Sequence, residues 1–160
     1  MSSAVADEAV LAGELELAQA DAARLGLAYA GGVAPPIAWE LVRNGQAILV
    51  DVRSGEERKF VGHVPGSLHV PWATGTSLTR NPRFVRELEA KLANEGGKQA
   101  VLLLLCRSGK RSALAAEAAA KAGFAYAFNV TEGFEGEIDS AQQRGRRDGW
   151  RFHGLPWAQD

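Results

Sequence analysis

The sequence predicts an α/β fold, an open and mainly parallel sheet flanked by helices on both faces. Three short apolar runs have the length and composition of strands that are buried on both sides, at residues 47–52, 100–105 and 125–130. Segments with helical character lie between them, and strands that alternate with helices imply right-handed crossovers and a parallel sheet. With 160 residues, the chain fits one core and leaves little for a second.

The N-terminal part of the chain predicts a helix that stands outside this pattern. Residues 7–25 are rich in Ala, Leu and Glu with apolar residues at helical spacing, and Gly26 is a suitable stop. The sequence AGGVAPP, residues 30–36, is typical of a short linker. We therefore expect a helical extension, residues 1–32, before a main domain at residues 33–160. The sequence pattern leaves open whether this helix packs on the main domain or mediates association with another protein chain.

The first half of the main domain contains four expected elements. Residues 36–45 predict a short helix, with a proline near its start and a glycine at its end. The first strand follows at residues 47–52. Residues 55–60 predict one helical turn, and the Pro-Gly break within residues 63–72 predicts a turn followed by a brief strand.

The second half of the domain repeats the alternation. Residues 81–97 predict a helix with Asn81 as its cap, and this helix precedes the strand at residues 100–105. A second helix, residues 112–123, precedes the strand at residues 125–130.

The C-terminal residues complete the expected architecture. Residues 134–145 predict one more helix, and residues 149–160 predict an aromatic tail that folds back over the domain. The core of the domain is thus expected to cover about residues 33–140, with the tail at residues 141–160.

Composition argues against several classes of function. A formal net charge of -1 argues against a nucleic-acid footprint over the whole surface. The sequence contains no run of about 20 apolar residues, so no membrane span is expected. The N-terminus carries early acids and lacks a basic start, which predicts a cytoplasmic protein rather than a secreted one. One cysteine cannot form an internal disulfide, and with three scattered histidines it offers no metal site, so neither metal nor cofactor is expected.

The single cysteine, Cys106, stands where a buried strand is expected to end. A helix begins about five residues later, and ligands of open α/β sheets bind at the carboxyl ends of the strands. The intervening RSGKR, residues 107–111, is too short to leave the thiol. Gly109 permits backbone angles that other residues resist. The amides of such a loop and the helix N-terminus point at a common centre and favour negative charge there.

Three positive charges in the same loop strengthen this interpretation, and they belong to Arg107, Lys110 and Arg111. They favour the thiolate form of the cysteine, but a more stable thiolate is a poorer nucleophile. Holding an anionic adduct on the sulfur is therefore the larger task of the loop. A lone cysteine after a run of leucines is usually a small buried hydrophobe. A basic, glycine-containing turn that opens a helix favours a functional thiol instead.

The loop CRSGKRS, residues 106–112, separates its cysteine and its second arginine by four residues. It resembles the active-site loop of the rhodanese-like sulfurtransferases, in particular the single-domain proteins of thiosulfate sulfurtransferase type. Three further segments resemble motifs of the same family in the same order: VDVRSGEE at residues 50–57, GHVPGSLHVP at residues 62–71 and NVTEGFEG at residues 129–136. Together the four motifs span roughly residues 33–140.

The resemblance implies a double-displacement reaction. The thiolate of Cys106 would take the outer sulfur of a small anionic donor such as thiosulfate and carry it as a persulfide. A thiol or cyanide acceptor, or a thiol on another protein, would then remove this sulfur. Arg111 matches the arginine that closes the loop and joins Cys106 as a catalytic residue. The expected contacts to substrate come from the rest of the loop and from one strand end, at Arg107, Ser108, Gly109, Lys110, Ser112 and Arg53.

The chain departs from the family pattern at three places. Phe134 stands where the second glycine of the closing turn is usual, and Ile138 stands where a tryptophan is common. One residue more than usual lies between Arg53 and Gly62, so the acidic position of the family falls on Glu56 or Glu57.

Two other functions fit the loop. Phosphatases and arsenate reductases with the same fold place five residues between the cysteine and the arginine, which makes a wider cradle for a tetrahedral oxyanion. The spacing of four in this chain favours a single sulfur atom. The second alternative is a persulfide carrier or regulatory module without turnover, which would dock on a partner through the extra helix or the tail.

Overall fold

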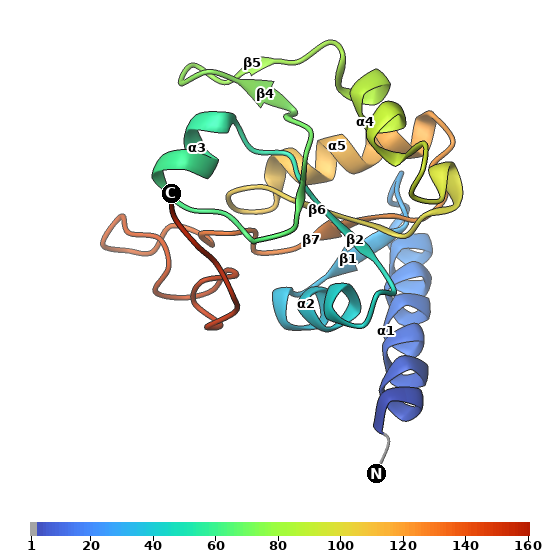
Figure 1. Cartoon of the computed structure of the whole chain (residues 1–160). Helices are drawn as coiled ribbons and strands as arrows, with labels where there is room; N and C mark the ends of the chain where they lie inside the picture. Colours follow the sequence, from blue (N-terminus) through green and yellow to red (C-terminus); the bar gives the residue numbers. More distant parts are fainter. Residues whose placement is uncertain (1–2) are drawn as a thin grey trace.

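The computed structural model describes residues 3–160, with side chains from residue 8 onward. Five strands form a parallel sheet in the order β1-β7-β6-β2-β3 (Figure 1). The strands are β1 (Gly31–Val33), β2 (Ile48–Asp51), β3 (Leu68–His69), β6 (Leu102–Leu105) and β7 (Ala127–Val130). The three strands that the apolar runs predict are β2, β6 and β7, the central three. The α/β class with a parallel sheet is confirmed.

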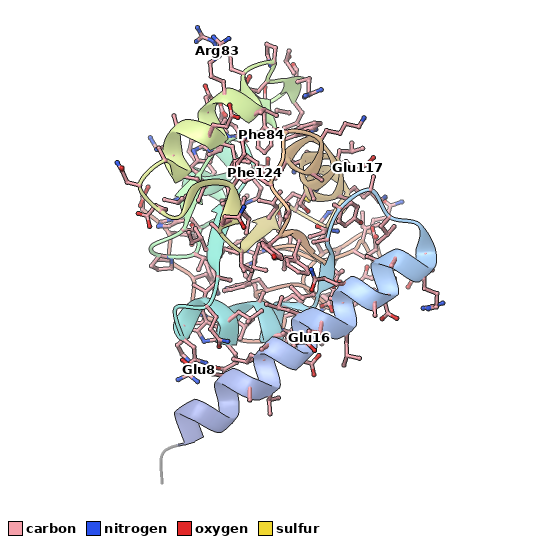
Figure 2. The ribbon with its side chains drawn as sticks, turned by 90° about the vertical axis from the view of Figure 1, so that its right-hand side faces the viewer. Glu8, Glu16, Arg83, Phe84, Glu117 and Phe124 are labelled. Atoms are coloured by element: carbon pink, nitrogen blue, oxygen red, sulfur yellow. The ribbon has the colours of Figure 1, made fainter. Side chains whose placement is uncertain are left out.

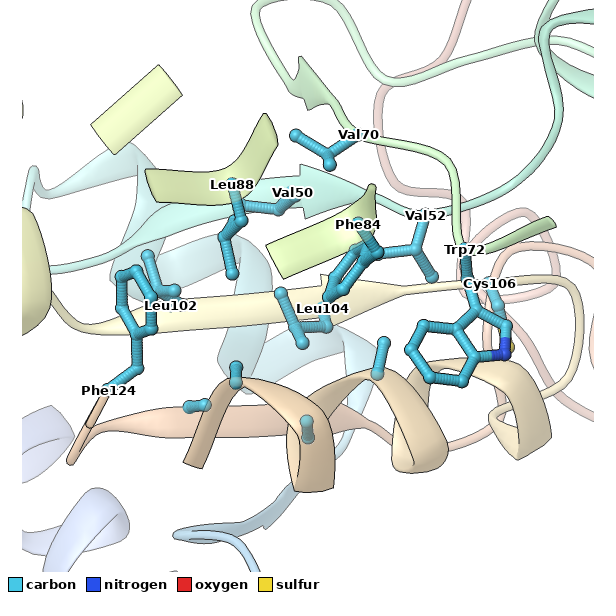
Figure 3. Packing of buried hydrophobic residues seen from close by; sticks show 14 of the residues in the cluster. Val50, Val52, Val70, Trp72, Phe84, Leu88, Leu102, Leu104, Cys106 and Phe124 are labelled. Carbon is cyan, nitrogen blue, oxygen red and sulfur yellow. The ribbon is translucent and has the colours of Figure 1, made fainter. Parts of the chain in front are cut away.

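Helices cover both faces of the sheet, and each face has its own hydrophobic core. Along β6, Leu102 and Leu104 point into one core, whereas Leu103 and Leu105 point into the other. Figure 3 shows the first of these cores. The covering helices are α4 (Phe84–Leu92) and α5 (Lys110–Lys121) on that face, with α1 (Ser3–Leu25) and α2 (Pro35–Arg43) on the opposite one (Figure 1). Within residues 3–160, no helix has both the length and the hydropathy of a bilayer span.

The segment expected to be a linker is instead the edge strand of the sheet. Residues 31–33 pair in parallel with residues 128–130 of β7. Helix α1 packs against this edge and against α2, with Ala18 and Ala22 buried (Figure 2). A Cβ at Gly31 would lie 2.5 Å from the carbonyl oxygen of Ala18, so glycine lets the helix approach the strand. The N-terminal helix therefore packs on the domain.

The middle of the chain contains a hairpin that the sequence does not predict. Strands β4 (Ala73–Thr74) and β5 (Thr79–Arg80) pair antiparallel, outside the main sheet. Helix α4 begins later than expected, because Asn81 forms a turn before it, in which its Oδ1 accepts the N–H of Arg83 at 3.0 Å. The remaining elements are short, α3 (Gly55–Phe60) and the 3-10 helix η1 (Gly97–Gln99).

The helix predicted at residues 134–145 does not form, so this prediction is wrong. The backbone at Gly136 and Gln142 is left-handed, with φ of 87° and 62°. The N–H of Gly136 is bound to the carbonyl oxygen of Arg107 at 3.1 Å, and the carboxylate of Asp139 accepts two nearby backbone N–H groups. These local bonds take the donors that a helix would need.

The aromatic tail folds back over the domain, as expected. Trp150 is fully buried, and its ring meets that of Trp39 edge to face with centroids 6.1 Å apart. Farther along, Ala158 and His63 exchange backbone hydrogen bonds of 2.8 and 2.9 Å. The tail is thus an integral part of one core and also pairs with the segment that precedes β3.

The close approach of α1 to β1 predicts opposite effects for two glycine substitutions. Gly31→Ala should lower the free energy of unfolding by about 1–3 kcal/mol, because the new methyl group meets the backbone of Ala18 at 2.5 Å. Gly13→Ala is the matched control, since a Cβ at Gly13 meets nothing within 4 Å and should stabilise α1 by about 0.5–1 kcal/mol. Chemical denaturation measures both values. Unchanged stability of Gly31→Ala would contradict the packing.

Candidate active site

The thiol of Cys106 lies at the carboxyl end of β6, where the chain turns into α5. The backbone N–H of Gly109 donates a hydrogen bond to its Sγ at 3.1 Å. Gly109 has φ of 99°, a left-handed conformation that favours glycine, and this turn aims the N–H inward. The structure thus brings together two residues that the sequence places in the site, with a loop donor directed at the sulfur.

Ser112 and Asn129 form a second contact to the sulfur. The hydroxyl oxygen of Ser112 lies 3.2 Å from Sγ of Cys106 and 2.5 Å from Oδ1 of Asn129. The amide nitrogen of Asn129 donates to the carbonyl oxygen of Gly109 at 3.1 Å, which fixes its Oδ1 toward Ser112. A hydroxyl group has one proton, so Ser112 donates either to Asn129 or to the sulfur. Ser112 can accept the proton of a thiol and can donate its own to a thiolate.

The sulfur of Cys106 is buried inside the loop and does not form part of the protein surface. Cys106 is 1% exposed and packs beside the ring of Trp72 at the end of the core under α4 and α5 (Figure 3). Of the loop residues that follow it, Arg107 and Ser108 are partly buried, whereas Lys110 is exposed. Because the thiol itself is buried, a donor must enter the loop to reach it.

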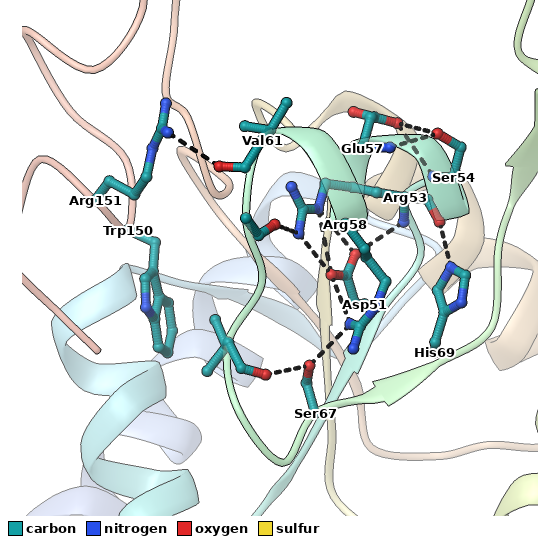
Figure 4. Close-up of polar contacts among 12 residues, drawn as sticks. Asp51, Arg53, Ser54, Glu57, Arg58, Val61, Ser67, His69, Trp150 and Arg151 are labelled. Carbon is teal, nitrogen blue, oxygen red and sulfur yellow. Dashed lines mark hydrogen bonds and ion pairs between the residues drawn. The ribbon is translucent and has the colours of Figure 1, made fainter. Parts of the chain in front are cut away.

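Arg111 anchors the loop to α3 through a bidentate ion pair. Its two terminal nitrogens donate to the carboxylate of Glu57 at 2.7 and 2.8 Å. Glu57 also forms a capping box with Ser54 at the start of α3 (Figure 4). Of the two acids that the sequence offers for the acidic position of the family, the structure therefore places Glu57 against the loop arginine.

This ion pair controls the ionisation of both partners. Burial raises the pKa of the Glu57 carboxyl, but the hydrogen bonds and the charge of Arg111 outweigh burial and lower this pKa from 4.5 to about 2. The hydrogen bond to Glu57 in turn raises the pKa of Arg111, against the opposing effect of burial. Both groups are charged throughout the physiological range, so the anchor is permanent.

Arg53 does not line the site, contrary to its expected contact with substrate. Its side chain is fully buried and pairs with the carboxylate of Asp51, with Nε–Oδ1 of 3.0 Å and Nη2–Oδ2 of 2.8 Å (Figure 4). It also donates to the carbonyl oxygen of Gly62 at 2.7 Å, and its guanidinium lies 4.2 Å from the centroid of the Phe134 ring. A buried charge needs such partners, so Arg53 serves the interior.

The turn after β7 packs directly against the cysteine loop and forms hydrogen bonds with it. A Cβ at Gly133 would lie 2.5 Å from the backbone of Arg107, so the turn touches the loop directly. The N–H of Phe134 donates to the carbonyl oxygen of Cys106 at 2.8 Å, and that of Glu135 donates to the carbonyl oxygen of Arg107 at 3.0 Å. Phe134 itself is fully buried.

A cavity of about 420 Å³ lies beside the loop and includes side chains of Arg107 and Glu57 in its wall. The remaining wall comes from α3, from the β4–β5 hairpin and from the segment after β7. Among residues 3–160, no three His, Cys, Asp or Glu side chains gather closely enough to hold a metal ion.

The model of the rhodanese-like domain family matches residues 34–137. The chain belongs to this family, and the parallel sheet with its cysteine loop has the sulfurtransferase-type fold.

The chain is also similar to individual proteins. The protein Rv0390 from M. tuberculosis, known from a crystal structure, is 42% identical, with a TM-score of 0.70 over 82% of this chain and 99% of that chain. The uncharacterized protein RP600 of Rickettsia prowazekii (strain Madrid E) is 36% identical over 117 residues, 73% of this chain and 87% of its own length. The polysulfide-sulfur transferase homodimer of Wolinella succinogenes is similar in fold alone, with 20% identity and a TM-score of 0.52 over 100% of this chain and 95% of that chain.

The ion pair of Glu57 predicts a pH-dependent contribution to stability. Glu57→Gln should lower the free energy of unfolding by about 1–2 kcal/mol at neutral pH, because the bidentate contact to Arg111 is weakened. The pKa of Glu57 is lower in the folded protein, so the contribution is complete above pH 4.5 and is lost as the pH falls toward about 2. Denaturation of both proteins across this range measures the difference.

Glu56→Gln is the matched control, since Glu56 is exposed and belongs to the same helix. Its difference from the unchanged protein should stay small at every pH. A Glu57→Gln difference that is independent of pH would contradict the ionised pair.

Proposed function

We propose that this protein is a sulfurtransferase that moves a sulfane sulfur from an anionic donor such as thiosulfate to a thiol or cyanide acceptor. A persulfide on Cys106 carries the sulfur between the two half-reactions. The observation that supports this proposal most strongly is the N–H of Gly109, which lies 3.1 Å from the sulfur of the only cysteine. A loop amide directed at a thiol stabilises negative charge there.

In the first half-reaction the Cys106 thiolate attacks the outer sulfur of thiosulfate. A bond forms between Sγ and the outer sulfur, the S–S bond of thiosulfate breaks, and sulfite leaves with the electron pair. Arg107 and Lys110 belong to the same loop, and their positive charges would attract the anionic donor. Ser108 adds a loop amide and a hydroxyl group at the same place. Arg111 holds the loop to α3 and contributes positive charge.

The acceptor of the hydrogen bond from the Ser112 hydroxyl group depends on the charge on Sγ of Cys106. While Cys106 is a thiolate, Ser112 donates to Sγ, and Asn129 loses this donor. In the persulfide, Sγ is bonded to the outer sulfur and the negative charge lies on that outer atom. Ser112 then donates its hydrogen bond to Oδ1 of Asn129 again, 2.5 Å away, and the loop amides hold the charged outer sulfur.

In the second half-reaction the acceptor removes the sulfur. A thiolate or cyanide attacks the outer sulfur of the persulfide, the bond to Sγ breaks, and the electron pair returns to Cys106 as thiolate. The products are an organic persulfide or thiocyanate. Neither half-reaction requires a proton to be delivered to a leaving group. The loop has only four residues between Cys106 and Arg111, which favours binding of one sulfur atom over a tetrahedral oxyanion.

Two measurements on the unchanged protein and on Cys106→Ser test this function. Intact mass after exposure to thiosulfate should show one added sulfur atom, which a thiol removes, and thiocyanate should form with turnover when cyanide is present. Cys106→Ser should lose both signals, because its hydroxyl group cannot carry the sulfur.

Other outcomes separate the alternatives. Loading of one sulfur without turnover would indicate a carrier in place of an enzyme. Hydrolysis of an aryl phosphate with no sulfur added to the protein would contradict the proposal and indicate phosphatase chemistry.

A further inference from the structure

Asn129, at the carboxyl end of β7, is linked to the sulfur of Cys106 by a single hydroxyl group. The hydroxyl oxygen of Ser112 lies between the two, 2.5 Å from Oδ1 of Asn129 and 3.2 Å from Sγ of Cys106. Ser112 has one proton to donate and two possible acceptors. The sulfur and the amide oxygen therefore compete for one donor, and the shorter contact is the one to Asn129.

Burial makes this competition costly for the acceptor that loses the donor. Ser112 is fully buried, Cys106 is 1% exposed and Asn129 is 7% exposed. A buried acceptor without a donor has no water to replace the missing hydrogen bond. The side chain of Asn129 is also held in its orientation, because its Nδ2 donates to the carbonyl oxygen of Gly109 at 3.1 Å.

The number of hydrogen bonds in this network depends on the state of the sulfur. In the thiol, Cys106 donates its proton to Ser112 and Ser112 donates to Asn129, so both bonds form in the same direction. When the thiol loses its proton to solvent, Ser112 donates to the thiolate, and Oδ1 of Asn129 loses this donor. In the persulfide, Sγ carries neither a proton nor the charge, and the bond from Ser112 to Asn129 forms again.

We propose that Asn129 is a positioning residue that acts through Ser112 and destabilises the free thiolate of Cys106 relative to both the thiol and the persulfide. A less stable thiolate is a stronger nucleophile. Asn129 thus favours the transfer of sulfur onto the protein. The effect on the persulfide rests on the proposed function, whereas the effect on the thiol does not depend on it.

The charges around the thiol act in addition to this network. Arg111 attracts the thiolate of Cys106. Tyr29 forms a hydrogen bond with Asn129, and burial and the charge of Glu117 raise the pKa of this phenol above its usual 10.0, so it is neutral where a thiol titrates. The other charged or titratable groups in the surrounding elements are Arg107 and Lys110 in the loop, Asp51 and Arg53 at the end of β2, Glu57 and Arg58 in α3, His69 in β3, Arg80 in β5, and Glu132, Glu135 and His153 at the turn after β7 and in the tail. A neutral substitution at Asn129 leaves all of these groups in place, so their contribution cancels when the variants are compared.

The ionisation of Cys106 tests the effect on the thiol, because the chain contains no other cysteine. The rate of alkylation by iodoacetamide, measured across pH, gives the apparent pKa of this thiol. Asn129→Leu keeps the size of the side chain but offers no acceptor, so Ser112 is free to donate to the thiolate. We expect the apparent pKa to fall by roughly 0.5–1 pH unit, the equivalent of one net hydrogen bond.

Three further variants separate this role from a general effect on the loop. Asn129→Ala should lower the apparent pKa as well, and it replaces Asn129→Leu if leucine prevents folding. Ser112→Ala removes the donor and should raise the apparent pKa, and Asn129→Leu should then change nothing further in the double variant. Thr131→Val removes a nearby hydroxyl group that donates to the carbonyl oxygen of Val33, and should leave the apparent pKa unchanged.

A merely structural role of Asn129 predicts the opposite sign. Loss of its contact with Gly109 would loosen the loop and weaken the hydrogen bond from the Gly109 N–H to the sulfur, so the apparent pKa would rise. A rise or no change in Asn129→Leu and Asn129→Ala, or a fall that persists without Ser112, would therefore overturn the proposed role.

The unchanged protein offers a test that needs no variant. The NMR shift of the side-chain carbonyl carbon of Asn129 should change with the titration of Cys106, because the carbonyl oxygen loses the proton of Ser112 when the thiolate forms. A shift that stays constant through this titration would also overturn the proposed role.

The equilibrium between the protein, thiosulfate and sulfite tests the effect on the persulfide. Intact mass gives the ratio of sulfur-loaded to free protein, at a fixed ratio of the two anions and at a pH above the apparent thiol pKa of every variant. This ratio should fall roughly three- to tenfold in Asn129→Leu and stay unchanged in Thr131→Val. Equal loading of Asn129→Leu and the unchanged protein would contradict the effect on the persulfide. If thiosulfate loads no sulfur onto the unchanged protein, the proposed function fails, and the alkylation results still decide the effect on the thiol.

Discussion

The hydrogen bond from the N–H of Gly109 to the sulfur of Cys106 depends on most of the other features of the fold. It requires a left-handed glycine at the start of α5, and a loop whose backbone is held in a fixed position at the end of β6. The turn after β7 fixes the position of the loop, because Gly133 packs on the loop backbone and the N–H of Phe134 donates to the carbonyl oxygen of Cys106. The tail holds the turn in place, since the N–H of Trp150 donates to the carbonyl oxygen of Gly133 at 2.8 Å. Residues far from the thiol in sequence thus determine its surroundings.

Charge is divided between the interior and the site. Asp51 compensates Arg53, whose guanidinium is also covered by the ring of Phe134, so this phenylalanine stabilises a buried cation. Glu57 compensates Arg111 and makes it an anchor. Arg107 and Arg144, for which the described residues provide no carboxylate partner, line the cavity beside the loop. This division explains how a chain with a formal net charge of -1 presents a local site for anions.

Local patterns in the sequence predict the central strands and the cysteine loop, because their apolar runs and turn residues act over a few positions. Contacts between distant segments were beyond such patterns. Gly31 reads as part of a linker but lies in an edge strand, since its partner β7 comes about a hundred residues later. The partners of Arg53 and the contact of Asn129 with Ser112 likewise depend on how the strand ends meet. The position of Asn129, a polar residue near the end of a predicted central strand, could have indicated this contact.

The central claim is that the loop amides hold the negative charge of a sulfur on Cys106, and NMR of the Gly109 amide tests it most directly. The account predicts a downfield shift of this amide proton when thiosulfate adds a sulfur to Cys106, with reversal when a thiol removes it and no shift in Cys106→Ser. A Gly109 amide that stays unchanged while the persulfide forms would contradict the account.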